Sequence, residues 1–149
     1  LWHLLKSRAR GTDVRESWLL GLGSHNSREA DLPCGGRILF DKVVIQKGAA
    51  SDNDDSIAVA TEPANCAPYA DTSFTMTRSW VVFDRPDGQI GTWGIKKAIP
   101  VVIADNRFVG SFRWEHFPPA GGSNRFFPSR AAAGLGARQI PSISGVPAR

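Results

Sequence analysis

Apolar and polar residues alternate with a period of two in several short segments of this chain, which is the pattern of half-buried β-strands. The clearest segment runs from Phe74 to Phe83, with Phe74, Met76 and Trp80 on one face and threonine and serine on the other. A Pro-Asp-Gly sequence follows, in which Pro86 suits the first central position of a β-turn. The pattern therefore predicts one long strand that ends in a tight turn.

Further strands are predicted where β-branched residues are bounded by glycine, proline or asparagine. The first ten residues have leucines at helical spacing and predict a turn or two of helix. Asp105 and Asn106 are the residue types that best tolerate a left-handed backbone, and they are expected to separate the last two strands. The expected strands besides 74–83 are Arg37–Gly48, Ile57–Thr61, Ile99–Ile103 and Phe108–Trp114.

These elements predict an all-β fold. Long helical patterns do not alternate with the strands, which disfavours a parallel α/β sheet, and 15 glycines and 10 prolines suit a chain of short strands and many turns. An antiparallel β-sandwich or jelly roll with long loops is the expected architecture. Residues 1–117 are expected to form this β domain, and residues 118–149 a loop-like segment rich in Gly, Pro and Arg.

The positive charge is concentrated near the end of the chain. The 149 residues carry a formal net charge of +4, and all 14 acidic residues precede Phe117. The excess comes from four arginines of the last segment, whose guanidinium groups can pair with phosphates through two parallel hydrogen bonds. These arginines are Arg125, Arg130, Arg138 and Arg149.

No pattern for catalysis, metal binding or membrane insertion is present. The two cysteines, Cys34 and Cys66, lack the spacing of a zinc ribbon or a redox dithiol, and whether they form a disulfide stays open. The three histidines have no partner at ligand spacing. The longest apolar runs are much shorter than the roughly 18 residues of a membrane span. The sequence therefore predicts neither an enzyme nor a cofactor or metal site.

Five segments, taken in order, resemble the coat proteins of geminiviruses, in particular those of the mastrevirus type. The Ala-Arg-Gly-Thr-Asp of residues 9–13 resembles an element near the first strand of that family. The alternating strand 37–44, the apolar strand with its Asp-Arg-Pro turn at 80–89, and the Arg-Phe-Val to Arg-Trp segment at 107–114 are similar to later strands. The Gly-Leu-Gly-Ala-Arg of residues 134–138 is similar to an element further on.

The resemblance implies a jelly-roll capsid subunit that assembles with copies of itself, in an icosahedral or twinned shell, and packages single-stranded DNA without catalysis. Virions and the host nucleus would be its locations. Inward-facing basic residues would neutralise phosphates, and aromatic residues would stack on bases. The candidates are Lys6, Arg8, Arg10, Arg37, Lys42, Lys47, Lys96, Lys97, Arg107 and Arg113.

A second hypothesis explains the five tryptophans of the chain in another way. Exposed tryptophan rings form the sugar-binding surfaces of many β-sandwich modules. A monomeric β-sandwich that binds a carbohydrate or a protein through Trp18 or Trp93 would use the same predicted strands. Response to single-stranded DNA, against response to a glycan, separates the two hypotheses.

Overall fold

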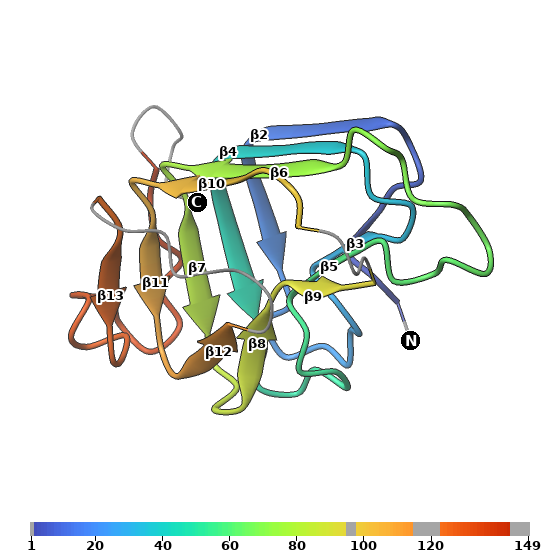
Figure 1. Cartoon of the computed structure of the whole chain (residues 1–149). Coiled ribbons are helices and arrows are strands. Elements are labelled where there is room, and N and C mark those ends of the chain that lie inside the picture. The colour runs from blue at the N-terminus through green and yellow to red at the C-terminus, as the bar shows by residue number, and fades with distance from the viewer. Residues whose placement is uncertain (1, 95–97, 115–122, 144–149) are drawn as a thin grey trace.

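The computed structural model describes residues 2–94, 98–114 and 123–143, and within these ranges it contains strands and turns but no helix. Every strand pairing among these residues is parallel (Figure 1). The strands are β1 (Leu5–Lys6), β2 (Gly11–Leu20), β3 (Ala30–Leu32), β4 (Arg37–Lys47), β5 (Ile57–Val59), β6 (Ser73–Thr77), β7 (Trp80–Phe83), β8 (Gly88–Ile90), β9 (Thr92–Trp93), β10 (Val101–Ala104), β11 (Arg107–Val109), β12 (Phe112–Trp114) and β13 (Arg125–Phe127).

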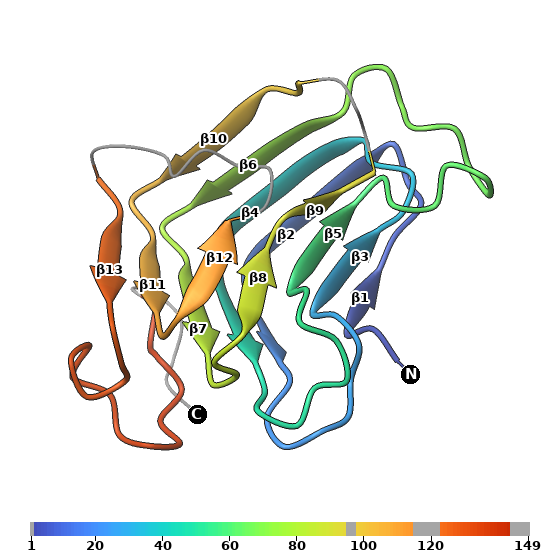
Figure 2. The ribbon, with the colours of Figure 1, turned by 60° about the horizontal axis from the view of Figure 1, so that its bottom comes forward.

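The chain winds into successive coils that stack on one another. Val14 is level with Phe40, Phe40 with Met76, and Met76 with Ile103, so one column of interior residues passes through four coils. The first four coils extend the long sheet with β2, with β4, with β6 and β7, and with β10 and β11, and each adds one strand to a shorter sheet of order β1-β3-β5-β9 (Figure 2). β13 extends the long sheet further, and β8 and β12 form a third sheet. This arrangement is a parallel β-helix, a fold in which each coil contacts mainly its neighbours.

The hydrophobic core fills the space between the three sheets. Phe40 and Phe74 come from neighbouring coils and meet edge to face with ring centres 5.8 Å apart. The ring of Phe108, which is buried, lies 5.2 Å from that of Phe126 in the next coil. Similar side chains thus stack along the axis of the β-helix. This stacking buries their apolar surface between successive coils.

A column of left-handed residues bends the long sheet. Glu16, Lys42, Arg78 and Asp105 occupy equivalent positions in four coils, and their φ angles are 46°, 53°, 52° and 61°. A non-glycine residue at positive φ is uncommon. Its recurrence at one level shows that the bend is a property of the whole sheet.

Polar side chains that follow the bend stabilise it. Ser79 Oγ accepts the N–H of Val43 at 3.0 Å, and Asn106 Oδ1 accepts the N–H of Ser79 at 2.9 Å. Asn124 Oδ1 in turn accepts the N–H of Asn106 at 3.0 Å. These bonds satisfy buried N–H groups from coil to coil at the place where the strands turn.

The predicted antiparallel sandwich or jelly roll is wrong, because the strands pair in parallel. Period-two alternation shows that one face of a strand is buried, but it does not encode the direction of the neighbouring strand. Parallel strands need a long crossover between them. Here the rest of each coil is the crossover, so no helix is required.

The predicted strand from Phe74 to Phe83 is interrupted. Arg78 takes a left-handed conformation, and the strand divides into β6 and β7. Phe74 therefore faces the interior, whereas Trp80 lies on the outer face and Val81 is buried inside. The turn after β7 is present, since the N–H of Gly88 donates to the carbonyl of Arg85 at 3.4 Å.

Other expectations have mixed outcomes. The strand at 37–48 is confirmed as β4, and Asp105 is left-handed as predicted, but β10 and β11 lie end to end in one coil. The predicted N-terminal helix is wrong, since β1 lies there. Cys34 and Cys66 form a disulfide that ties the long loop after β5 to the corner after β3. The predicted domain boundary at 117 falls outside the described residues.

Candidate binding surface on the long sheet

Most of the basic residues predicted to contact DNA are already paired with carboxylates. An arginine or lysine held by a nearby carboxylate must break that pair before it can neutralise a phosphate. Lys96 and Lys97 lie outside the described residues. The carboxylate partners are Asp31 and Glu62 for Lys6, Glu62 for Arg8, Asp71 for Arg10 and Arg37, Glu16 for Lys42, Glu29 for Lys47 and Asp54 for Arg113.

The N-terminal cluster illustrates this neutralisation. Lys6 Nζ lies 2.8 Å from Asp31 Oδ2 and 2.8 Å from Glu62 Oε1, and Arg8 donates to Glu62 Oε2 at 2.8 Å. The hydrogen bonds from Lys6 and then Arg8 lower the pKa of Glu62 from 4.5 to about 2. His3 Nε2 lies 3.3 Å from Asp31, and burial lowers the pKa of this histidine. This cluster ties the first coil to the second and third.

Lys47 points into the β-helix and not toward solvent. Its ammonium donates to the carbonyls of Ser27 and Asp55 at 2.7 Å each and lies 3.5 Å from Glu29 Oε2. Both charged side chains have no exposed surface. Burial lowers the pKa of Lys47 and raises the pKa of Glu29. A residue so enclosed cannot contact DNA, so the prediction for Lys47 is wrong.

Arg107 is the exception among the predicted residues. It is level with Trp80 of β7 on one side and with Arg125 of β13 on the other. Its guanidinium carbon lies 5.0 Å from the centre of the Trp80 ring, a cation–π contact. Both arginines are exposed, and neither forms an ion pair with any carboxylate of the described residues.

A second aromatic ring completes this surface. Phe127, two residues after Arg125, stacks on Trp80 with ring centres 6.5 Å apart and planes inclined by 16°. Trp80 thus contacts both a cation and an aromatic ring. We call Trp80, Arg107, Arg125 and Phe127 the arginine–aromatic surface; it lies on the outer face of the long sheet where β7, β11 and β13 run side by side (Figure 1).

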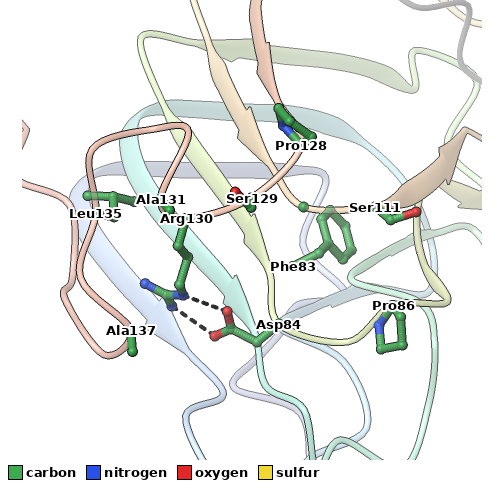
Figure 3. Close-up of a pocket in the computed structure, with 11 residues that line it drawn as sticks. Phe83, Asp84, Pro86, Ser111, Pro128, Ser129, Arg130, Ala131, Leu135 and Ala137 are labelled. Atoms are coloured by element: carbon green, nitrogen blue, oxygen red, sulfur yellow. Dashed lines mark hydrogen bonds and ion pairs between the residues drawn. The ribbon is translucent and has the colours of Figure 1, made fainter.

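The segment after β13 folds back over the ends of these strands. Arg130 donates to both carboxylate oxygens of Asp84, at 2.6 Å and 2.8 Å, and to the carbonyl of Gln139 at 2.8 Å. Burial acts to raise the pKa of Asp84, but hydrogen bonds from Arg130 and Gln46 hold it below its usual value. The pair joins two parts of the chain that are distant in sequence (Figure 3).

Two adjoining pockets flank this ion pair. One, of about 560 Å³, lies among Phe83, Ser111, Pro128 and Leu135, as Figure 3 shows. The other, of about 520 Å³, is lined by Leu22, Gln46, Arg138 and other residues. Among the residues that line the two pockets, only Asp84 has a carboxylate, and it already forms an ion pair with Arg130. The paired carboxylates of acid–base hydrolysis are therefore not found in these two pockets.

Sequence reasoning found part of the arginine–aromatic surface. It named Arg107, and it noted that Arg125 belongs to a terminal segment without acids. It missed the register of Arg107 with Arg125, because register between coils depends on the lengths of the intervening loops. Of the tryptophans proposed for sugar binding, Trp18 is half-buried on β2, and the side chain of Trp93 lies outside the described residues.

Comparisons with known proteins identify no relative: no family model, no curated protein and no solved structure matches the chain. The part of the chain that the structure describes contains no group of three metal-ligating side chains. Within the same ranges there is no helix long and apolar enough to cross a membrane.

Proposed function

We propose that this protein is a non-catalytic binding module for single-stranded nucleic acid, which it contacts through the arginine–aromatic surface. The observation that carries the proposal is the register of Arg107 with Arg125, both exposed and both without a carboxylate partner among the described residues.

Two like charges in register on adjacent strands destabilise a sheet. Adjacent strands lie about 4.8 Å apart, and like charges placed opposite one another repel. Elsewhere in the described chain, arginines on the sheet have acidic partners, such as Asp13 for Arg15 and Asp41 for Arg78. A phosphate that binds across Arg107 and Arg125 removes the repulsion and accepts parallel hydrogen bonds from the planar guanidinium groups.

The aromatic residues supply a second, sequence-independent contribution. Base stacking on an aromatic side chain is worth about 1–3 kcal/mol per base. Trp80 and Phe127 lie beside the two arginines, so a chain that places phosphates on the arginines brings its bases close to these rings. Phosphate contact and stacking together are how proteins bind single strands without reading sequence.

The capsid function stays a prediction that no observation here supports. It rests on a resemblance that implies a jelly roll, and the chain forms a parallel β-helix. The shell, the virion and the nuclear location depend on the same resemblance. Disulfides such as Cys34–Cys66 persist chiefly in oxidising environments, which does not favour a nuclear location.

The salt dependence of binding tests the proposal. For single strands, log K falls against log salt with a slope of about −0.7 per phosphate contacted. One phosphate bound across Arg107 and Arg125 gives a slope of about −0.7, and a separate phosphate on each arginine gives about −1.4, whereas phosphates on all eight described residues predicted to contact DNA would give about −6. Fluorescence anisotropy of a labelled oligothymidine between low and moderate salt measures this slope.

Matched variants identify the surface. R107A/R125A is expected to abolish most of the binding, while R8A, which removes an arginine already paired with Glu62, leaves it unchanged. Quenching of Trp80 fluorescence should accompany binding in the native chain. Binding to an acidic polysaccharide but not to the oligonucleotide would overturn the proposal in favour of a carbohydrate module.

A further inference from the structure

The first coil leaves one edge of the long sheet open. β2 pairs with β4 along one side, and no described strand pairs with its other side. Its interior residues Val14 and Leu19 are only half-buried, whereas Phe40 and Ile45, which are level with them in the second coil, have no exposed surface. An unpaired strand of this kind presents free N–H and C=O groups to which another strand can add.

Exposed apolar side chains gather in the same coil. Among the described residues, five large apolar side chains are strongly exposed, and three of them precede β3. They are Trp2, Leu4 and Leu22, with exposed fractions of 83%, 40% and 57%. Exposed apolar side chains that gather in one coil are typical of a surface that another protein covers.

The hydrogen bonds of β2 show which backbone groups point to the open edge. The carbonyl of Arg10 accepts the N–H of Arg37, so residue 10 faces β4. In a strand, successive residues direct their N–H and C=O groups to opposite sides. Val14 therefore directs its backbone groups toward β4, while Asp13 and Arg15 direct theirs to the open edge.

We propose that β2 pairs antiparallel with β2 of a second copy of this chain, about a two-fold axis that passes through Val14. In this register each Asp13 lies directly opposite Arg15 of the second copy, and these two residues exchange both backbone hydrogen bonds. Val14 then faces Val14 of the second copy at the closer, non-hydrogen-bonded position. The long sheet continues through the axis from one β-helix to the other.

The side chains fit this register. Asp13 and Arg15 lie on the outer face and already pair with each other, with Arg15 Nε donating to Asp13 Oδ1 at 2.8 Å. The two-fold axis brings a second such pair alongside with its charges reversed, so that each carboxylate has two guanidinium neighbours. Opposite charges across a strand pair stabilise it. A self-complementary patch of this kind is what a two-fold interface requires.

The expected result is a dimer in solution, which light scattering after size-exclusion chromatography, at micromolar concentrations, measures directly. D13K places two positive charges opposite each other at both ends of the contact and is expected to yield a monomer. The double variant D13K/R15E restores the complementarity with the signs exchanged and is expected to restore the dimer. D52K, an equal change of charge on an exposed loop, is the control and should remain dimeric.

A further variant, D13P, tests the backbone pairing by comparison with D13A, which removes the same carboxylate but keeps the backbone N–H. D13P removes an N–H that only the second copy would use, and proline is tolerated in an edge strand; it should yield a folded monomer by circular dichroism. A monomeric native chain, a dimer unaffected by both D13K and D13P, or failure of D13K/R15E to restore the dimer would each overturn this register. The residues changed in R107A/R125A lie on β11 and β13, which do not pair with β2, so this variant should dimerise like the native chain.

Discussion

Lys47 shows how one left-handed residue within a strand changes the face on which a later side chain lies. Strict alternation from Ile38 and Phe40 would place Lys47 on the outer face of β4, but Lys42 adopts a left-handed φ of 53° and shifts the alternation after it. Val43, Ile45 and Lys47 then all face the interior. Because Lys42 is neither glycine nor asparagine, its residue type gives no warning of the shift.

The buried Lys47–Glu29 pair yields a stability prediction. K47M removes the ammonium group that lies beside the Glu29 carboxylate and donates to the carbonyls of Ser27 and Asp55. Removing one partner of a buried ion pair costs about 3–5 kcal/mol of unfolding free energy, and urea denaturation should show a loss of that size. K47M/E29Q should recover part of it, and K42M, on the surface, should change stability by less than about 1 kcal/mol. A K47M chain as stable as the native one would contradict the buried pair.

Glu62 yields a prediction about pH. Its pKa in the folded chain is about 2, below the usual 4.5, because Lys6 and Arg8 stabilise the charged form. The unfolded chain therefore binds this proton first as the pH falls. The stabilisation is complete above pH 4.5 and is lost as the pH falls toward 2. E62Q should flatten the fall of unfolding free energy over this range in denaturant titrations, while E16Q serves as the surface control; equal slopes for E62Q and the native chain would contradict the prediction.

At the scale of elements, the sequence predicts where strands lie better than how they pair. β4 and the turn after β7 were predicted from β-branched runs and from Pro86, because these signals are local. The pairing of β2, β4, β6 and β10 could not be predicted in this way, because it depends on loops of unequal length that contain no repeat in residue type. Ser79, Asn106 and Asn124, whose hydrogen bonds join successive coils, are the clearest sign of the coils in the sequence. Serine and asparagine are also common at the bends of ordinary loops, however.

The buried polar side chains at the bend, of which Asn106 is one, give a prediction about how neighbouring coils stabilise each other. Asn106 is buried, accepts the N–H of Ser79 and donates to the carbonyl of Met76 at 2.8 Å. N106A leaves both backbone groups unpaired, at about 1–3 kcal/mol for each group, so thermal or urea unfolding should show a loss of about 3 kcal/mol. D105G at the neighbouring left-handed position suits glycine and should change stability by less than about 1 kcal/mol. Equal effects of the two variants would show that Asn106 does not link the coils.

At the scale of the molecule, the first and the last described coils have different environments. The first coil is open along β2, while the last described strand, β13, leads into a segment whose Arg130 pairs with Asp84 at the end of β7. Val82 and Val109 alternate with interior residues of β7 and β11, so they face outward, yet both are fully buried. The outer face is therefore covered at this point. Arg130 pairs with Asp84 and Ile143 is buried, so the tail that composition marked as a loop is part of the packed structure.

The Asp84–Arg130 pair is expected to hold that segment in place. R130M keeps the length of the side chain but removes both hydrogen bonds to Asp84 and the one to the Gln139 carbonyl. A half-buried carboxylate without its cation favours exposure to water, so the segment should open more often. Arg138, on the same segment, is a cleavage site for trypsin, and limited proteolysis followed by mass spectrometry measures how often it becomes accessible.

We expect R130M to be cut after Arg138 several times faster than the native chain, with unfolding of the coils themselves little changed. R125M, in β13 and before the ion pair, is the matched control, and its rate of cleavage at Arg138 should equal that of the native chain. Reversal of the pair in D84R/R130D should slow the cleavage again if the charge contact itself is responsible. Equal rates in R130M and the native chain would mean that apolar contacts alone hold the segment to the sheet.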